Sequence, residues 1–407
     1  IVAADLTTLS NILKDLYLGP VQEQLQNDIL LLQRIEPKAQ DLVGNQAVIP
    51  LHTSRTGGIG ARPEGGALPT DGNQSYRKIT YDLKYLYGAI KVSGIAMLKT
   101  RSDAGAFLRA LESEIDGLKA DLQKDTSRQL YGDGTGAIAV LTTGSSTTVL
   151  NTLTNESLLK GQIYPNMVIT VGTLADPNSR SSTAGVVSAV DPAGNGGLGT
   201  VTLVAAISGS GGAGEFIFRN LNAVDGPIAY ETNGLQNIVS TSTGTSLGGL
   251  AASTEPLWDN VRLDNGATSI VLDNLEKILG RIRINGGKPT VAITSHGIRR
   301  QVFNALSSQI RYMEPQSLKG GFTAVQYGDY PIISDVDAPY GRVYLLDEAQ
   351  LRMFSPEDWN WLDEDGKTLK WDTGFDRWIA VMRRAMQFGA VRRNTHGVLY
   401  GITDAGF

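Results

Sequence analysis

Four groups of residues have types and spacings that could carry out chemistry, and the first is a glycine-rich run. Residues Gly194 to Gly199 match the dinucleotide-binding pattern G-x-G-x-x-G. In a dinucleotide site these glycines lead into a helix whose N-terminus holds the phosphates. Here the next segment, Thr200 to Ala205, is β-branched and typical of a strand. The run is therefore predicted to be a turn.

Acidic side chains near the end of the chain form the second group. Paired carboxylates could serve a hydrolase or bind calcium, and the candidates are Glu357, Asp358, Asp363, Glu364 and Asp365. Asp363 and Asp365 fall in a predicted hairpin turn, and no complete calcium-binding loop follows them. A solvent-exposed turn is the favoured interpretation.

The histidines are the third group. None of His52, His296 and His396 has a partner at the spacing of a catalytic triad or a metal site. We expect ordinary polar roles for them. No catalytic residue, cofactor site or metal site is predicted anywhere in the chain, and this absence favours a structural protein over an enzyme.

Three arginine doublets, at 299–300, 383–384 and 392–393, are the fourth group. Arginines can bind phosphate, but these doublets lack the interleaved aromatic residues of a nucleic-acid site. The formal net charge of -5 gives no strong field, so charge alone implies neither nucleic acid nor a membrane surface. Ion pairs between subunits are the favoured role of the doublets.

The composition is that of a soluble globular protein. With 407 residues, of which 41% are hydrophobic, the chain can form cores for two or three domains. It has no cysteine, which excludes disulfides and thiolate chemistry and fits a reducing cytoplasm. No apolar run reaches the roughly 18 residues of a membrane span. The sequence starts at Ile1, so either a piece was cleaved or the numbering begins partway in.

A long projecting β-hairpin is predicted between Gln46 and Ala89. Its second strand, Tyr76 to Ala89, alternates strictly and places one set of apolar side chains on a single face: Ile79, Tyr81, Leu83, Tyr85 and Tyr87. The first strand is Gln46 to Thr53, and a Gly- and Pro-rich stretch without periodicity separates the two. Because two strands alone leave an edge and a face uncovered, we expect a second copy of the chain to cover them.

The element that organises the chain is a long helix from about Thr100 to Gly132. A single apolar stripe with helical spacing marks it: Phe107, Leu111, Ile115, Leu118 and Leu122. Ser102 is the predicted N-cap. Such a helix would span about 45 Å and could connect distant parts of a flat molecule.

Two regions flank the hairpin and the helix. The first forty residues are predicted to form two short amphipathic helices, interrupted at Gly19-Pro20, which pack either on the parent chain or on a neighbour. Residues 137–214 contain few charges and many Gly, Ser, Thr and Val residues. Short strands are expected there at Met167 to Val171, Gly185 to Val190 and Thr200 to Ala205, which indicates a small inserted β-barrel or sandwich.

The rest of the chain is predicted to be mixed α/β with a β-rich tail. One helix carries Leu272 to Ile282 and stops at Gly286-Gly287, and Ser295 caps a second helix after a buried strand. Further strands are predicted at 331–333, 343–346, 378–382 and 389–393. A hairpin is expected to join 359–362 to 368–371 through Asp365-Gly366.

This order of parts resembles the major capsid protein of tailed bacteriophages, the Hong Kong 97-type fold. Local stretches that look like this family are Tyr131 to Gly136 after the long helix, Pro339 to Asp347, and the Asp365-Gly366 turn. The resemblance covers essentially the whole chain and lies in the order of elements rather than in one motif. It implies an α+β fold with a long spine helix, a projecting β-hairpin called the extension loop, and an inserted all-β domain.

The resemblance also implies a division of the chain into parts. These are an N-terminal helical arm (1–43), the extension loop (44–95), the spine helix of a peripheral domain (96–136), an inserted β-barrel-like domain (137–221), an axial domain (222–354) and a β-rich return to the peripheral domain (355–407). The extension loop would lie over the adjacent subunit, and the tips of the axial domains would meet at symmetry axes.

An assembly interface follows from this division. Its predicted residues are Arg55, Arg62, Glu64, Arg77, Lys78, Tyr81, Leu83, Lys84, Tyr85, Tyr87, Arg383, Arg384, Arg392 and Arg393. Some members of the family join subunits covalently through a lysine of the extension loop and an asparagine of a neighbour. Lys78 or Lys84 with Asn394 have suitable residue types, but no motif fixes such a crosslink, and it is not expected.

The implied function is self-assembly into an icosahedral head around phage double-stranded DNA. Partners would be further copies of the chain in pentamers and hexamers, with portal, scaffold and decoration proteins, no sequence-specific DNA contact and no membrane. Assembly would take place in the cytoplasm of a host bacterium, and the product would be the capsid of a virion. Two alternatives remain: the shell of a cellular nanocompartment, and a β-rich carbohydrate-active enzyme with two facing carboxylates.

Overall fold

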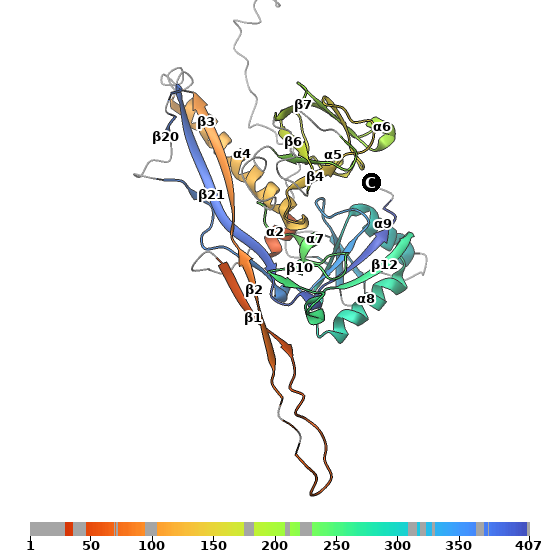
Figure 1. The fold of residues 1–407 in the computed structure, drawn as a ribbon. Coiled ribbons are helices and arrows are strands. Elements are labelled where there is room, and N and C mark those ends of the chain that lie inside the picture. Colours follow the sequence, from red (N-terminus) through yellow and green to blue (C-terminus); the bar gives the residue numbers. More distant parts are fainter. Residues whose placement is uncertain are drawn as a thin grey trace, which may run out of the picture.

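The computed structural model of the chain has four parts, shown in Figure 1: a central sheet, a long ribbon backed by a helix, a hairpin and a barrel. It describes residues 29–35, 46–68, 70, 72–93, 104–174, 183–207, 212–219, 230–307, 316–317, 323–327, 330–363, 370–372 and 374–404. The central sheet and the ribbon with its helix are together called the body below. The predicted α+β class is confirmed.

The central sheet has seven strands in the order β12-β22-β17-β13-β16-β15-β14. Their bounds are β12 Val261–Thr268, β13 Val291–Thr294, β14 Gln316–Ser317, β15 Thr323–Tyr327, β16 Tyr330–Ser334, β17 Val343–Leu346 and β22 Gly397–Ile402. Every residue of β13 and β17 is buried, as expected for apolar runs at the middle of a sheet covered on both faces. The predicted strands at 331–333 and 343–346 are thereby confirmed.

Helices α8 (Leu272–Ile284) and α9 (His296–Ser307) follow the predicted pattern. The apolar stripe of α8 packs into one buried cluster with β13, β16 and β17. Gly286 adopts a positive φ directly after α8, and the Ser295 Oγ accepts from the Ile298 amide at the start of α9. Both predicted helix boundaries are therefore confirmed.

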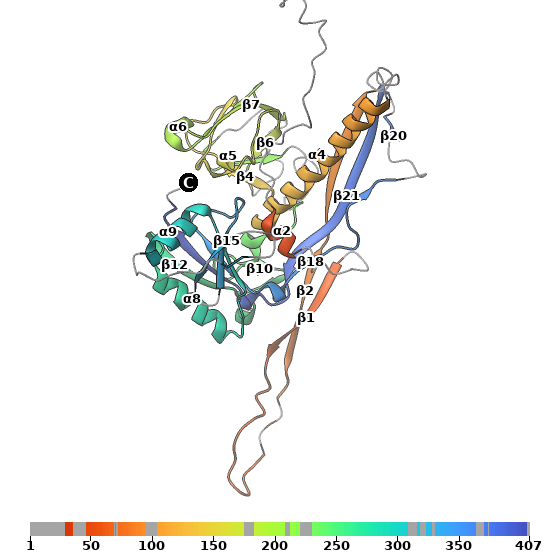
Figure 2. The same cartoon turned by 180° about the vertical axis from the view of Figure 1, so that it is seen from behind.

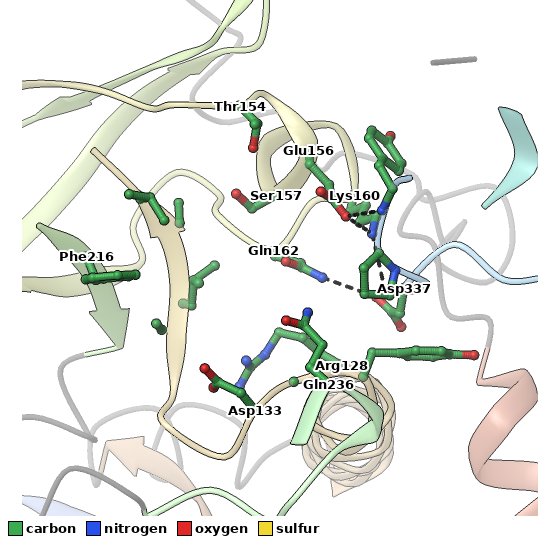
Figure 3. A pocket seen from close by; sticks show the side chains of 18 of the residues that line it. Arg128, Asp133, Thr154, Glu156, Ser157, Lys160, Gln162, Phe216, Gln236 and Asp337 are labelled. Carbon is green, nitrogen blue, oxygen red and sulfur yellow. Dashed lines mark hydrogen bonds and ion pairs between the residues drawn. The ribbon is translucent and has the colours of Figure 1, made fainter. Parts of the chain in front are cut away.

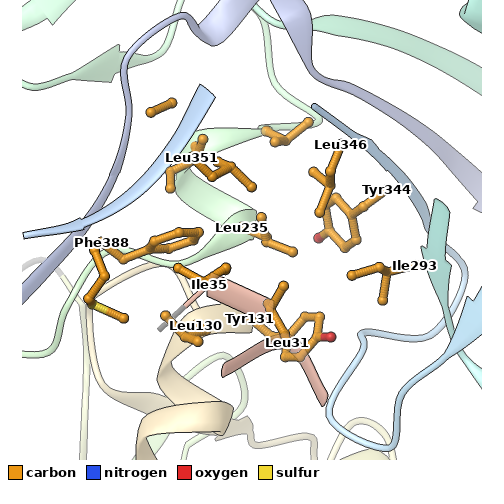
Figure 4. Close-up of a cluster of buried hydrophobic side chains, with 14 of the residues drawn as sticks. Leu31, Ile35, Leu130, Tyr131, Leu235, Ile293, Tyr344, Leu346, Leu351 and Phe388 are labelled. Carbon is orange, nitrogen blue, oxygen red and sulfur yellow. The ribbon is translucent and has the colours of Figure 1, made fainter. Parts of the chain in front are cut away.

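A second buried cluster, shown in Figure 4, joins the sheet to the ribbon. Leu31 and Ile35 of α2 (Leu30–Ile35) meet Leu130 and Tyr131 at the end of the long helix. Among the other elements that contribute are α7 (Leu235–Ile238), β18 (Leu351–Phe354) and four strands of the central sheet, β13, β16, β17 and β22. The described part of the predicted N-terminal arm thus packs on its own chain, and the rest of that prediction lies outside the described residues.

The ribbon is built on β21 (Arg377–Ala390), and α4 (Ala104–Tyr131) lies along it in both Figure 1 and Figure 2. One edge of β21 pairs with β3 (Lys84–Ser93), and the other pairs in turn with β18, β19 (Asn360–Trp361) and β20 (Lys370–Trp371). The predicted long helix is confirmed over these bounds, while its proposed cap, Ser102, lies outside the described residues.

One prediction about the tail is confirmed in part, and another is wrong. The segment expected at 378–382 lies within β21, whereas only residues 389–390 of the segment expected at 389–393 belong to that strand, and Arg393 begins a short 3-10 helix. The segments around 359–362 and 368–371 do not pair with each other as a hairpin, because each pairs with β21. The turn Asp365-Gly366 itself lies outside the described residues. Short-range turn signals could not reveal that a third, distant strand supplies the hydrogen bonds.

The predicted strand from Tyr76 to Ala89 is divided at Leu83. Residues Ser75–Asp82 form β2, which pairs with β1 (Gln46–Ser54), whereas β3 pairs with β21. The inward face changes parity at this break, so that β3 turns Gly88 and not Tyr87 toward α4. A Cβ at Gly88 would lie 2.8 Å from Leu118 Cδ1 and 2.9 Å from Leu122 Cδ1, which shows how closely the helix approaches.

The strands β1 and β2, with the loop between them, form the hairpin that projects from the body in Figure 1. Its base is fixed by the small hairpin of β10 (Ser246–Leu247) and β11 (Leu250–Ala251). The Thr80 amide donates to the Gly248 carbonyl at 2.9 Å. Beyond this contact the hairpin extends as two strands.

The inserted all-β unit is confirmed as a closed barrel. Six strands lie in the order β4-β9-β6-β7-β8-β5. They are β4 Ala137–Val140, β5 Val149–Asn151, β6 Val168–Gly172, β7 Gly185–Asp191, β8 Thr200–Leu203 and β9 Phe216–Arg219, with the short helices α5 Glu156–Leu159 and α6 Gly194–Gly197 between strands. A bridge from Leu141 to Thr152 closes β5 onto β4, and the Leu153 amide donates to the Val140 carbonyl at 2.7 Å.

The glycine-rich run of the sequence lies in this barrel as a tight connection from β7 to β8. Asn195 and Gly196 both have positive φ, so α6 is not a regular helix. The strand β8 follows directly, as predicted, and offers no helix N-terminus for a phosphate. The prediction of a turn is confirmed.

Candidate assembly interface

The hairpin carries exposed apolar side chains without a core of its own. On its strands Val48 and Tyr76 are more than half exposed, and in its loop Ile59 and Leu68 are 82% and 87% exposed. Arg55, Arg62, Glu64 and Lys78, which were predicted as interface residues, are exposed on the same hairpin. A two-stranded hairpin in water is marginal, so this surface is suited to packing against another molecule.

The base of the hairpin belongs to the core of its own subunit, which corrects two predicted interface residues. Tyr81 and Leu83 are 1% and 7% exposed. The Tyr81 hydroxyl donates to the Ala390 carbonyl at 2.9 Å, and the ring stacks on Phe354. Burial raises the pKa of this phenol well above its usual range. These side chains cannot contact a second copy while the subunit is folded, because the body already covers them.

Arg77 is also engaged within its own chain. Its Nε lies 2.7 Å from Oε1 of Glu255, next to the contact that holds the base of the hairpin. The Arg77 side chain remains more than half exposed, so the ion pair contributes little to the stability of the fold.

Tyr85 and Tyr87 lie on the outer face of the ribbon, opposite to α4. Both are more than half exposed, and Tyr87 is paired in register with Arg383, which is exposed beside it. Lys84 lies at the start of the same strand and is partly buried. The structure thus brings three of the predicted interface residues, Tyr85, Tyr87 and Arg383, together on one face of β3 and β21, while Lys84 belongs to the inward-facing set of β3.

Two arginines of the predicted doublets are buried, and their assignment to an interface is corrected. Arg393 is fully buried and donates to three backbone carbonyls, those of Ile238 at 2.7 Å, Thr245 at 2.9 Å and Asn237 at 3.1 Å. Burial lowers its pKa to about 10. Arg384 is 3% exposed and lies over the ring of Trp359. Each arginine holds loops of its own subunit.

The first members of these two doublets, Arg383 and Arg392, remain on the surface. Arg392 is exposed and donates to the Asn285 carbonyl at 3.2 Å, and Asn285 in turn donates to the Asn394 carbonyl. Alternation explains the difference for Arg383 and Arg384, because neighbouring residues of a strand point to opposite faces and both lie in β21. Arg393 instead begins a short 3-10 helix after β21 has ended. The sequence shows where the doublets are, but it does not indicate which arginine of each pair is buried.

Two of the three histidines make ordinary packing or polar contacts. His52 packs against Tyr76 on the hairpin, with the rings tilted and their centroids 5.1 Å apart. His396 is fully buried, its Nδ1 accepts from the Asp347 amide, and burial with the nearby charge of Arg393 lowers its pKa to about 3. In the described ranges of the chain, no group of three or more His, Asp and Glu residues could hold a metal ion. No helix there is long and apolar enough to cross a membrane.

A polar cleft of about 300 Å³ separates the barrel from the body, as Figure 3 shows. Arg128 and Asp133, at the end of α4, face Glu156 and Lys160 of the barrel across it, and Asp337 of the body closes one side. Three cations, Arg128, Lys160 and Arg342, and three carboxylates, Asp133, Glu156 and Asp337, line the cleft, so their formal charges cancel. Sequence reasoning did not identify these residues.

A buried ion-pair network lies beside this cleft on α4. Arg128 bonds Asp125 at 3.0 Å and Glu231 at 2.5 Å, and Arg219 of the barrel reaches Asp125 at 3.1 Å. Burial alone would raise the pKa of Asp125, but the charges of Arg128 and Arg219 lower it to about 2. This carboxylate therefore stays ionised and holds both arginines.

The fold is similar to solved structures of shell proteins. It matches a chain of the capsid asymmetric unit of cyanophage A-1(L) with a TM-score of 0.63 and 13% identity, over 98% of this chain and 99% of that chain. This chain has the Hong Kong 97-type capsid fold. No family model matches the sequence, and no curated protein matches it.

Two further structures have the Hong Kong 97-type fold of this chain. The capsid of an empty GTA particle matches with a TM-score of 0.52 and 10% identity, over 98% of both chains. The SrpI encapsulin complex of Synechococcus elongatus PCC 7942 matches with a TM-score of 0.50 and 8% identity, over 100% of this chain and 98% of that chain. The projecting hairpin of this chain lies within the residues predicted for it, and α4 lies within the stretch predicted as a long helix.

Proposed function

We propose that this chain is a shell subunit that self-assembles into a closed capsid, and more specifically that it is the major capsid protein of a tailed bacteriophage. The single observation that carries the proposal is the hairpin, whose apolar loop and strands extend from the body without any core of their own. A surface of this kind gains stability only when another copy covers it. The match to the cyanophage capsid over nearly the whole chain supports the same function.

In this proposal many modest contacts add up across a closed shell. The hairpin of one copy lies over its neighbour, and the exposed ribbon face with Tyr85, Tyr87 and Arg383 supplies a second contact. The body from about 222 to 354 would form the axial domain, with its tip near a symmetry axis of a pentamer or hexamer. Portal, scaffold and decoration proteins would be further partners, and assembly would occur in the cytoplasm of the host bacterium.

A second candidate is the shell of a cellular nanocompartment, because the SrpI encapsulin complex has the same fold. The two candidates differ in what the shell encloses, which is double-stranded DNA in one case and protein cargo in the other. A crosslink between Lys78 or Lys84 and Asn394 is not part of either proposal. A carbohydrate-active enzyme is not proposed, since the matching structures are shells.

Sedimentation velocity of the purified native material, followed by negative-stain imaging of the fast fraction, tests the proposal. We expect closed particles of megadalton mass. A 43.5 kDa chain that stays monomeric under all assembly conditions would refute self-assembly. If particles form, nuclease treatment followed by extraction distinguishes the two candidates, because only a phage head protects long double-stranded DNA.

A further inference from the structure

The barrel and the body do not share any of the hydrophobic cores found among the described residues. One cluster contains barrel residues alone, including Ile169, Val187 and Ile217. The other two clusters contain none. The first and last strands of the barrel are neighbours, with Ala137 opposite Phe218, so the chain leaves the barrel beside the point where it enters. The barrel is therefore a closed unit with its own core and adjacent ends.

Lys160 makes the central contact between the barrel and the body. Its Nζ donates to the carbonyls of Ala338 at 2.7 Å and Asp337 at 3.3 Å, and it lies 2.6 Å from Oε1 of Glu156. The same Glu156 oxygen accepts from the Tyr340 amide at 3.0 Å. The Lys160 side chain is 2% exposed, so these acceptors depend on one ammonium group with little help from water.

Asp337 connects this contact to α4. Its side chain is fully buried, and its Oδ2 lies 3.0 Å from Nζ of Lys124. Lys160 thus binds the backbone of the Asp337 loop, and Lys124 binds the Asp337 carboxylate. These three residues, called the clamp below, connect the barrel through a loop of the body to the long helix. The bond from Arg219 to Asp125 runs beside it.

Clefts border the clamp on two sides. The cleft of about 300 Å³ in Figure 3 and a second one of about 600 Å³ share the same central residues, which are Arg128, Lys160, Gln162 and Asp337. Their open volume means that no close-packed apolar layer surrounds the clamp. A few charged hydrogen bonds, rather than interdigitated side chains, therefore set the orientation of the barrel.

We propose that the barrel is a separately rigid module and that the Lys160 clamp is a releasable joint which fixes its orientation on the body. Breaking the clamp frees the barrel to turn about its paired ends, β4 and β9, while both units stay folded. The joint lies within one chain and therefore does not depend on assembly. It gives a shell subunit a part that can change position without remodelling either core.

Hydrogen exchange on the full chain tests the joint with Lys160→Met, which keeps the aliphatic stem and removes the ammonium. The Tyr340 amide reports on the clamp, and the Val187 and Leu203 amides, bonded within the barrel to Met167 and Thr148, report on the barrel. We expect exchange at Tyr340 to rise roughly ten- to hundredfold, because a charge-assisted hydrogen bond is lost, with no change at the two barrel amides.

Lys277→Met is the matched control. It removes an ammonium from an exposed ion pair with Asp273 on α8, away from the barrel, and should change none of the three amides. Equal acceleration at Tyr340 and in the barrel would overturn the inference, since the barrel would then unfold together with the joint. Unchanged exchange at Tyr340 would overturn it as well, because Lys160 would not hold the joint.

A milder variant covers the case in which Lys160→Met does not fold. Glu156→Gln keeps an acceptor for the Tyr340 amide and removes the charge that faces Lys160. We expect a rise of about two- to fivefold at Tyr340, with the barrel amides again unchanged. The same two outcomes as above would contradict the proposal.

Discussion

The hairpin and the barrel are both made of short antiparallel strands, yet they leave very different surfaces. In the barrel each of the six described strands has two neighbours, because the bridge from Leu141 to Thr152 closes the sheet. Thirteen of its described residues form an apolar core. In the hairpin β1 has one neighbour, and large apolar side chains are exposed along the strands and in the loop. The barrel is complete within one chain. The hairpin is not, and this difference points to a second copy as its missing partner.

The largest expected effect is on assembly. Ile59→Asp places a charge in the exposed hairpin loop, where it would have to be buried against a neighbour. We expect at least a tenfold loss of fast-sedimenting particles, with the thermal midpoint of the unassembled chain unchanged. Val204→Asp makes the same chemical change at a 68% exposed position of the barrel and should assemble normally. If both variants lost particles equally, the exposed apolar residues of the hairpin would be no more important for assembly than those of the barrel.

The next effect tests where the hairpin ends and the body begins. In Gly389→Ala the new Cβ would lie 2.8 Å from ring carbons of Tyr81. Because a stacked, buried ring cannot move aside, we expect a loss of about 1–3 kcal/mol in the free energy of unfolding, measured with urea. Gly57→Ala in the hairpin loop is the control, because a Cβ built there has no other group within 4 Å. It should change the free energy of unfolding by less than about 0.5 kcal/mol.

The body should also carry a pH dependence from His396. Burial, with the charge of Arg393, lowers the pKa of His396 to about 3, whereas the unfolded chain has an ordinary value of about 6.5. Between these values only the unfolded state binds the proton, so this group favours folding at neutral pH and loses that contribution as the pH falls. Its loss should reach about 2 kcal/mol between pH 8 and pH 5.

Urea unfolding at both pH values measures this dependence, with His396→Asn as the control. The asparagine Oδ1 can replace Nδ1 as the acceptor of the Asp347 amide but does not titrate. The pH-dependent loss should therefore be smaller in the variant by about 2 kcal/mol. An equal slope in both proteins would show that His396 is not the group responsible.

The smallest expected effect is the difference in unfolding stability between removing the hydroxyl of a buried tyrosine and removing that of an exposed one. Tyr81→Phe removes a hydroxyl that donates to the Ala390 carbonyl and accepts from the Ala390 amide, and this should cost about 1 kcal/mol. Tyr87→Phe, on the outer face of the ribbon, should leave the urea midpoint of the unassembled chain unchanged. A loss of similar size in both variants would mean that β3 is packed more tightly than its exposure indicates.

Local periodicity was enough to predict most of the elements. The stripe of α8, the buried runs of β13 and β17 and the short strands of the barrel all appear in the structure close to where the sequence places them. These elements depend on the spacing of neighbouring apolar residues, which a sequence shows directly. The order of the elements was enough to indicate the fold, and the matching capsid structure agrees.

Pairing between distant segments was not predictable. The alternation from Ile79 to Tyr87 continues without a break in the sequence, so nothing local indicates that β2 and β3 separate at Leu83. The break follows from β21, which pairs with β3 on one side of α4 and leaves Tyr85 and Tyr87 outside. The same long strand, β21, pairs with both segments that were expected to pair with each other around Asp365.

The sequence by itself determined the periodic elements, their order and the absence of cysteine chemistry. Only the tertiary structure decided which polar residues are buried: Asp125 to Gln129 form a polar turn that would be expected on the surface of α4, yet all five residues are buried. Their partners, such as Glu231 and Arg219, lie about a hundred residues away. A charge is tolerated inside a protein only when distant groups satisfy it, and the chain must fold before those groups meet.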